Sequence, residues 1–252
     1  MRLTILGTGT ISLSPARSCA GYLVEHDSVI LLLDCGCGVT RRLAEFALPW
    51  RAITHVAITH FHIDHYGDLP SLIFAWRYGM HPARSAPLDL IGPAGTIELL
   101  HRLAAAHGPW VLDPGFPIRV TEISHGGEVA LAEDTLLSAF KVPHTPESVA
   151  YSMAAERHRL VYTGDMGFDE AFATWARECD VLLCECSLPE MLAIPEHLTP
   201  TRCGVLAELA SPARLVLTHL YPSVEGVDIA DAVVARYDGP LVVAHDGWQS
   251  QI

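Results

Sequence analysis

The chain has 252 residues and half of them are apolar, so its composition allows a sizeable buried core. Its net charge is −13, with one lysine against 15 arginines. This balance disfavours a large nucleic acid, because such binding depends on basic residues that neutralise phosphates. A small anionic substrate is still compatible with this net charge, since bound divalent metals would offset the negative charge locally.

The sequence contains no apolar run of about 18 residues, the length that a membrane-spanning helix needs. Residues 1–7 form a strand-and-glycine pattern rather than a leader of the secretory type. We therefore expect a cytoplasmic protein without a membrane segment, and one domain over residues 1–252.

Short β-rich runs and amphipathic stretches alternate in the first half of the chain. Strands are predicted at 3–6, 21–25, 29–34, 55–59 and 88–91. Helices are predicted at 39–47, 69–78 and 96–107, and Gly79 ends the second of them.

The middle of the chain has a different pattern, in which strands follow one another with only turn residues between them. These strands are predicted at 118–123, 128–131, 136–142, 148–155 and 159–162. Strands joined by short turns usually pair with their neighbours in sequence, so this stretch predicts an antiparallel segment.

The alternation of strands and helices returns in the last third. Helices are predicted at 168–177, 199–209 and 229–237, and strands at 181–184, 215–218 and 241–244. Thr199 is the expected N-cap of its helix, with Pro200 at the first helical position. The whole order predicts an α/β sandwich of two layered halves, with mixed sheets and helices on the outer faces.

Seven cysteines in a chain without a secretion signal argue against a disulfide framework. Two Cys-x-Cys pairs, Cys35/Cys37 and Cys184/Cys186, follow apolar runs in which residues i and i+2 point to the same face. We interpret both pairs as small buried hydrophobes near a strand end.

The segment 59–65 concentrates three imidazoles and one carboxylate just after an apolar strand: His60, His62, Asp64 and His65. Imidazole and carboxylate suit zinc, manganese or iron rather than calcium. His60 and His62 share one side if the segment is extended, whereas Asp64 and His65 lie at the turn into the next helix. This spacing favours two metals over one, and over a chance cluster of surface histidines.

Three further ligand-type residues each lie beyond an apolar run: His144, Asp165 and His219. Any one of them alone could be a polar residue that ends a strand. Three at the same relative position, together with the cluster, predict the remaining ligands of a metal pair.

The order of these residues resembles the metallo-β-lactamase fold superfamily. The chain has HxHxDH at 60–65, then a lone histidine, a Gly-Asp pair and a Thr-His pair, and an early strand that ends in Asp34-Cys35-Gly36. The resemblance covers nearly the whole chain and implies a four-layer αββα sandwich of two mixed β-sheets. It also implies two divalent metal ions, zinc first, with manganese or iron as alternatives.

Carried over by position, the resemblance assigns seven ligands. One metal would be held by His60, His62 and His144, and the second by Asp64, His65 and His219, with Asp165 bridging them. Asp34 would fix the orientation of a ligating histidine; the alternative is an aspartate that forms a turn before glycine.

Within the superfamily the chain resembles the phosphodiesterase branch that includes ribonuclease Z. The Gly-Thr-Gly at 7–9 and the tail at 242–247 fit this branch, as does the segment 196–199 ahead of a helix. The resemblance implies a catalytic role for His197, as an acid or a phosphate contact, beside Asp64 in the metal centre. His245 has no ligand position to fill, so it is either a substrate contact or a polar residue at a strand end.

Two insertions known in this branch are absent. His144 and Asp165 are 21 positions apart, which leaves no room for the tRNA-binding arm of bacterial ribonuclease Z. The segment 12–18 is too short for the cysteine-rich insertion of ribosyl cyclic-phosphate phosphodiesterases; its Arg17 and Ser18 either contact a phosphate or belong to a plain loop. We expect a small-molecule or short-oligonucleotide phosphodiester as substrate, and the resemblance makes a homodimer plausible.

The expected reaction is the attack of a metal-bridging hydroxide on phosphorus, while His197 protonates the departing alkoxide. The same centre could instead hydrolyse a carboxylic ester, lactone, thioester or β-lactam by polarising its carbonyl. An iron-dependent sulfur dioxygenase is a third interpretation. Diiron members of the superfamily carry glutamate where this chain has His62, which argues against a diiron oxidoreductase.

Overall fold

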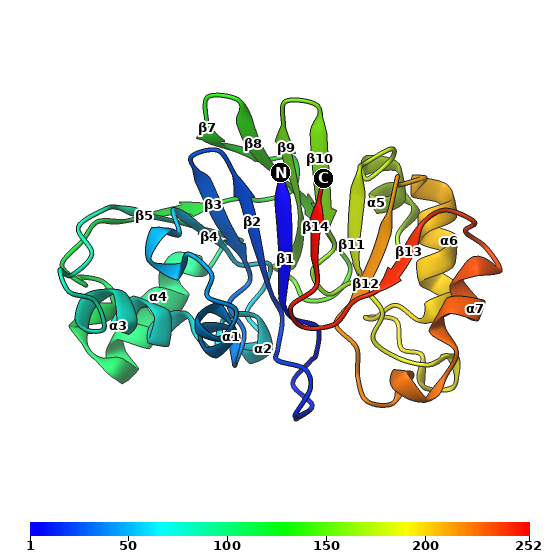
Figure 1. The fold of residues 1–252 in the computed structure, drawn as a ribbon, viewed down its shortest axis with the longest axis horizontal. Helices are drawn as coiled ribbons and strands as arrows, with labels where there is room; N and C mark the ends of the chain where they lie inside the picture. The colour runs from blue at the N-terminus through cyan, green and yellow to red at the C-terminus, as the bar shows by residue number, and fades with distance from the viewer.

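Two seven-stranded β-sheets pack face to face in the computed structural model, which describes residues 1–252 (Figure 1). The first sheet has the strand order β14-β1-β2-β3-β4-β5-β6. In that order the strands span Gln249–Gln251, Arg2–Gly7, Gly21–His26, Val29–Leu33, His55–Ala57, Leu88–Gly92 and Ile118–Glu122.

The second sheet repeats this plan with the order β13-β12-β11-β10-β9-β8-β7. Its strands span Leu241–Val243, Leu215–Thr218, Val181–Glu185, His158–Tyr162, Val149–Ala155, Thr135–Lys141 and Glu128–Ala132. Each sheet has an antiparallel half and a parallel half. In the first sheet the strands from β14 to β3 pair antiparallel and those from β3 to β6 pair parallel. In the second sheet the strands from β7 to β10 pair antiparallel and those from β10 to β13 pair parallel.

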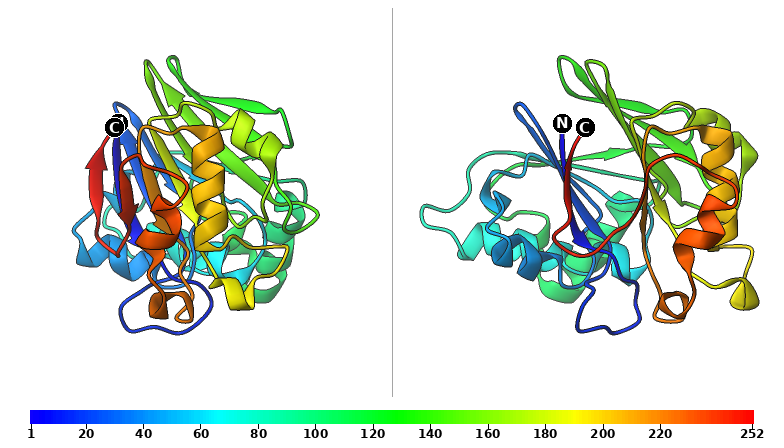
Figure 2. Two further views of the ribbon diagram at one scale, coloured as in Figure 1. Left: turned by 90° about the vertical axis from the view of Figure 1, so that its right-hand side faces the viewer. Right: turned by 45° about the vertical axis from the view of Figure 1, so that its right-hand side comes forward.

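Seven α-helices form the two outer layers. The first sheet is covered by α1 (Val39–Glu45), α3 (Leu69–Tyr78) and α4 (Thr96–His107), with the single turn α2 (Ile63–Tyr66) at its edge. The second is covered by α5 (Glu170–Trp175), α6 (Pro200–Ala210) and α7 (Ile229–Val234). Figure 2 shows the two sheets between these helix layers from two further sides. Four short 3₁₀ turns complete the elements, at Trp50–Ala52, Pro109–Val111, Glu190–Leu192 and Val224–Gly226.

Three hydrophobic clusters hold the four layers together, one between the sheets and one under each helix layer. Strand β3 shows why its sequence is continuously apolar rather than alternating. Leu31 and Leu33 lie in the cluster between the sheets, whereas Leu32 lies in the cluster beneath the helices. Both faces of the strand are therefore buried. This architecture confirms the predicted αββα sandwich.

Most predicted elements are present, including helices 69–78 and 96–107 with the same bounds and Thr199 as the N-cap of α6. One strand prediction is wrong in its pairing. Strand β6 does not join the antiparallel segment but pairs parallel with β5 in the first sheet, because the chain changes sheets after it. The four strands β7 to β10 do form the antiparallel segment.

The chain termini meet in the first sheet, where the last strand, β14, pairs antiparallel with β1 (Figure 1). This strand was not predicted, because its Gln-Ser-Gln sequence has no apolar alternation. The helix predicted at 168–177 is shorter, since α5 covers only Glu170–Trp175. None of the helices combines the length and the hydropathy that a membrane span requires.

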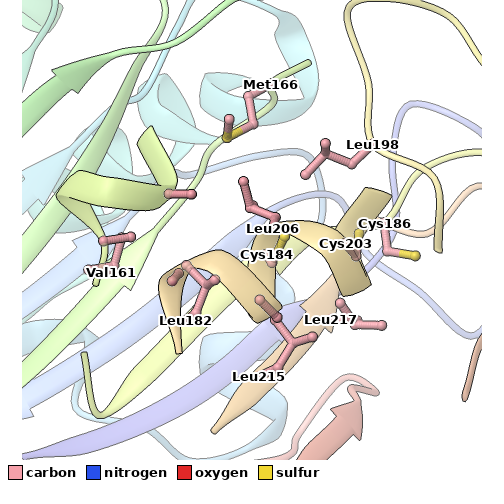
Figure 3. Close-up of a cluster of buried hydrophobic side chains, with 14 of the residues drawn as sticks. Val161, Met166, Leu182, Cys184, Cys186, Leu198, Cys203, Leu206, Leu215 and Leu217 are labelled. Atoms are coloured by element: carbon pink, nitrogen blue, oxygen red, sulfur yellow. The ribbon is translucent and has the colours of Figure 1, made fainter. Parts of the chain in front are cut away.

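The cysteines follow the prediction with one exception. Cys184 and Cys186 lie with Cys203 among leucines of the cluster under α6 (Figure 3). Cys35 is also buried, but Cys37 is exposed and the prediction of a buried residue is wrong there. The alternation of faces does not reach Cys37, because β3 ends at Leu33 and a turn follows.

Candidate metal centre

Four strands that end at the same edge of the sandwich bring together the predicted ligands. The segment after β4 carries His60 and His62, and the loop after β8 carries His144. Asp165 follows β10, and His219 follows β12 directly. The carboxyl ends of parallel strands meet at one edge, so residues far apart in the sequence lie side by side here.

The single turn α2 changes the backbone direction after His62, so that the residues before it and those within it belong to different groups of donors. His62 is the last extended residue before α2, while Asp64 and His65 lie within the turn and are buried. The turn is held against the loop after β3, where the amide of Cys35 donates to the carbonyl of His65 at 2.7 Å. A Cβ at Gly36 would lie 1.9 Å from the carbonyl oxygen of Asp64, so only glycine permits this approach.

The side chains form two adjoining groups of ligand type. In each group the donor atoms lie within 4.8 Å of one another. The first group contains His60, His62, His144 and Asp165, and the second contains Asp64, His65 and His219. Asp165 faces both, since its carboxylate oxygens lie 3.3 Å from Nε2 of His219 and 3.8 Å from Nε2 of His144.

Four buried atoms of this cluster make no hydrogen bond of normal geometry, although Oδ1 of Asp165 lies 3.2 Å from Nε2 of His65 and 3.3 Å from Nε2 of His219. Nε2 of His60, His65 and His219 and Oδ1 of Asp165 are all buried without such a bond. Unpaired buried polar atoms are costly, and here four of them point at the same small volume. Metal ions would satisfy all four, and the imidazole and carboxylate donors suit zinc, manganese or iron.

The other ring nitrogen of each buried histidine is engaged from outside. Nδ1 of His65 lies 2.7 Å from Asp34, and Nδ1 of His219 lies 2.9 Å from the hydroxyl of Ser187. Asp34 is fully buried and also accepts hydrogen bonds from Thr59 and Tyr162. These contacts leave Nε2 free to face the centre, which is how ligating histidines are usually oriented.

The pKa values of the metal-free cluster keep Asp165 ionised and His60 neutral, which are the forms that bind metal ions. Burial opposes the charge of Asp165, but His219 and His65 outweigh it and hold the pKa of this carboxyl well below its ordinary range. Burial, followed by the charge of His65, lowers the pKa of His60 well below its ordinary value. Burial alone would lower the pKa of His65 too, but Asp165 and Asp34 raise it well above that value. Metal binding would therefore displace a proton from His65.

His197 lies beside the cluster and is held by a residue that the sequence analysis missed, Glu185. Nδ1 of His197 lies 3.0 Å from the Glu185 carboxylate, and its ring lies 4.9 Å from the ring of His144 and 5.8 Å from that of His219. Glu185 is fully buried and also accepts the amide proton of Met166, next to Asp165. Its signal in the sequence is a charged residue at the end of the apolar run 181–184.

The only lysine of the chain supports the loop that carries His144. The ammonium of Lys141 donates to the carbonyls of Val142, Thr145 and Ser148 at 3.1, 2.6 and 3.3 Å. It points at backbone oxygens rather than at the centre, so its role is to hold the loop.

The Gly-Thr-Gly loop and the C-terminal tail are joined through Asp246. Its carboxylate accepts hydrogen bonds from the amide and hydroxyl of Thr8 and from the amide of Ser18, and it pairs with Arg42 at 3.0 Å. Arg17 is engaged by Glu225. These contacts make Ser18 and Arg17 part of the loop structure.

The other flagged histidine, His245, lies just after β13 and is absent from both groups of donors. The side chain of His245 is exposed and contacts only the carbonyl of the next residue, at 3.0 Å. It therefore belongs to neither group of ligands.

A family model, the beta-lactamase superfamily domain, matches residues 30–220. The protein Rv1339 of Mycobacterium tuberculosis is 32% identical over 246 residues, which cover 96% of this chain and 88% of that protein. The ribonuclease Z of Haloarcula marismortui is 24% identical over 308 aligned positions, which cover 100% of this chain and 97% of the relative. These matches span the strands and loops that carry the candidate metal ligands.

Solved structures share the fold over the same length. The metallo-β-lactamase fold protein YhfI from Bacillus subtilis superposes with a TM-score of 0.84 at 22% identity, covering 99% of this chain and 98% of that one. At this identity the likeness concerns the fold, including the edge at which the candidate ligands meet.

Proposed function

This chain belongs to the metallo-β-lactamase superfamily of metal-dependent hydrolases, and we propose that it is a phosphodiesterase that uses two metal ions on a small or short phosphodiester. The observation that carries the proposal is the set of four buried, unpartnered donor atoms beside a histidine that is oriented by a buried glutamate. The first feature suits a metal pair, and the second suits proton transfer to a leaving group.

The residues that would hold the metals follow from the two groups of donors. His60, His62 and His144 would bind one ion, and Asp64, His65 and His219 the other, with Asp165 between them. When bound, such ions activate water at neutral pH and neutralise charge on a phosphate. Asp34 would keep Nε2 of His65 directed at its ion by holding Nδ1 on the opposite side.

His197 would donate a proton to the departing oxygen. Glu185 fixes Nδ1 of the imidazole, so the free Nε2 is the nitrogen that can carry the transferred proton. Burial disfavours the charged ring, but the charge and hydrogen bond of Glu185 outweigh it and raise the pKa of His197 to about 9. Bound metal cations would lower this value by repulsion, towards the range in which a general acid works best near neutral pH.

The preference for a small substrate rests on the surroundings of the cluster. The residues between His144 and Asp165 form β9, β10 and their turns, so this part of the chain has no inserted arm that could bind a folded nucleic acid. The net charge of −13 also opposes a long polyanion. A cyclic nucleotide or a short oligonucleotide end fits both observations.

Turnover of two substrate classes on one metal-loaded preparation tests the proposal. We expect hydrolysis of bis-nitrophenyl phosphate, and little or none of a panel of lactones, thioesters and β-lactams. Metal content should approach two ions per chain, and chelation should abolish turnover. Efficient turnover of the carboxylic panel with no phosphodiesterase activity would assign the centre to acyl substrates instead.

A further inference from the structure

A second polar pocket lies at the other end of the first sheet. The metal centre is found beyond the carboxyl end of β4, whereas this pocket of about 310 Å³ lies where β4 and β5 begin. Its lining comes from five different segments of the chain, and the residues that the argument uses are Arg51, His55, Arg84, Asp89 and Arg119. Nothing in the proposed reaction involves them.

Arg84 brings a buried positive charge without a carboxylate partner. Only 6% of the residue is exposed, and its guanidinium donates to four carbonyls, those of Ala86, Ile53, Pro87 and Arg51, at 2.9, 2.8, 2.7 and 3.4 Å. It lies over the ring of Trp76 at 4.7 Å and forms no ion pair. Carbonyl oxygens carry only partial charge, so an anion in the adjoining pocket would offset an otherwise uncompensated cation.

Two more arginines line the pocket. The guanidinium of Arg51 stacks on Trp50 at 4.7 Å and makes no hydrogen bond or ion pair within the protein. Arg119 binds Asp89 through two hydrogen bonds of 2.7 Å each, which neutralises the only carboxylate of the lining. Three guanidinium groups against one carboxylate leave two positive charges in a chain whose net charge is −13.

His55 adds a buried donor or acceptor with an open position. The residue is 7% exposed, and its Nδ1 lies 2.7 Å from the hydroxyl of Thr54. Its Nε2 has no hydrogen-bond partner, and the nearest carboxylate oxygen, on Asp89, is 3.8 Å away. The hydroxyl of Thr54 donates its one proton to the carbonyl of Ile30 at 3.1 Å, so Nδ1–H of His55 donates to Thr54 and Nε2 of the neutral ring is left as an acceptor that faces the pocket.

We propose that this pocket binds a phosphate group, either as inorganic phosphate or as the phosphate of a small monoester. Arginine forks recognise phosphate oxygens, and two net positive charges match a phosphate dianion. The donors left for a ligand are the guanidinium of Arg51 and the N–H groups of Arg84 and Arg119 that no protein oxygen accepts, chiefly on Nη1. The site needs no metal, so it is independent of the proposed reaction.

The test is a titration of the metal-loaded protein with inorganic phosphate, followed through the imidazole signals in NMR spectra. The signal of His55 is assigned by its absence from His55→Asn, which separates this pocket from any phosphate bound at the metal centre. We expect phosphate to shift the His55 signal and Arg51→Gln to weaken the dissociation constant by about tenfold or more, because one charged donor is lost. A parallel titration with glycerol phosphate distinguishes the two sources, since the natural ligand class should bind more tightly.

Arg102→Gln is the matched control, because Arg102 is an exposed arginine of α4 that pairs only with Glu98. It should bind phosphate like the wild type. An unmoved His55 signal in the wild-type protein overturns the proposal. Equal binding by wild type, Arg51→Gln and Arg102→Gln also overturns it, since the shift would then reflect ionic strength alone.

Discussion

Replacement of His197 by alanine tests the proposed proton donor. A positioned general acid contributes about 10²–10⁴-fold to a rate, so hydrolysis of a phosphodiester with an alkyl leaving group should slow by that factor. A nitrophenyl leaving group departs as a stable anion and needs no proton, so its release should slow by less than about tenfold. The measurement is kcat/KM for both esters on the same metal-loaded preparations.

The pH profile gives a second measure of the same role. The donor works only when protonated, so activity on the alkyl ester should fall as pH rises through the pKa of His197. That pKa is raised to about 9 in the metal-free protein, and bound cations would move the fall to lower pH. The fall should vanish in His197→Ala. In Glu185→Gln it should shift further towards low pH, because the charge that raises the pKa is removed.

His101→Ala is the control, since this exposed histidine of the outer helix α4 makes no side-chain hydrogen bond or ion pair. It should leave both rates unchanged. If His197→Ala slows both esters equally and keeps the alkaline fall, proton donation by His197 is refuted, and a contact to the phosphate would explain the loss.

Four further predictions follow from contacts around the centre. Asp34→Asn should weaken metal affinity by about 10–100-fold, measured by competition with a chelator, because the hydrogen bond that orients a ligand is altered; unchanged affinity would contradict the assigned role. Gly36→Ala should lower the bound metal content, because its Cβ would displace Asp64, whereas Gly226→Ala, with nothing within 4 Å, should bind metal like the wild type. Asp246→Ala should reduce the free energy of unfolding by about 1–3 kcal/mol in urea titrations, because the amides of Thr8 and Ser18 lose their carboxylate acceptor, while Arg42 keeps its ion pair with Glu45; a loss well below about 1 kcal/mol would show that water replaces the carboxylate. Removal of metal should lower the unfolding temperature, since free ion at about 1,000 times its Kd stabilises the native state by about 4 kcal/mol; equal melting with and without chelator would contradict a bound ion.

Local sequence was sufficient for most elements. The apolar runs predicted the strands because strands buried on both faces need no polar positions, as Leu31 to Leu33 show. The bounds of α3 and α4 were also predictable, since Gly79 and Gly108 stop them and the residues between are amphipathic. HxHxDH predicted a metal-binding segment, because so many ligand-type side chains seldom gather by chance next to a strand end.

Tertiary structure decided what local pattern does not encode. Whether β6 pairs with β5 or with the strands after it depends on long-range packing, and β14 forms only because the edge of β1 is available to it. Glu185 belongs to no motif, and its role appears only when β11 lies beside the loop that carries His197. The arginine-lined pocket likewise depends on five segments that meet at one end of a sheet. The sequence determines which chemical groups the side chains carry. Their pKa values, partners and exposure depend on neighbours that folding brings from elsewhere in the chain.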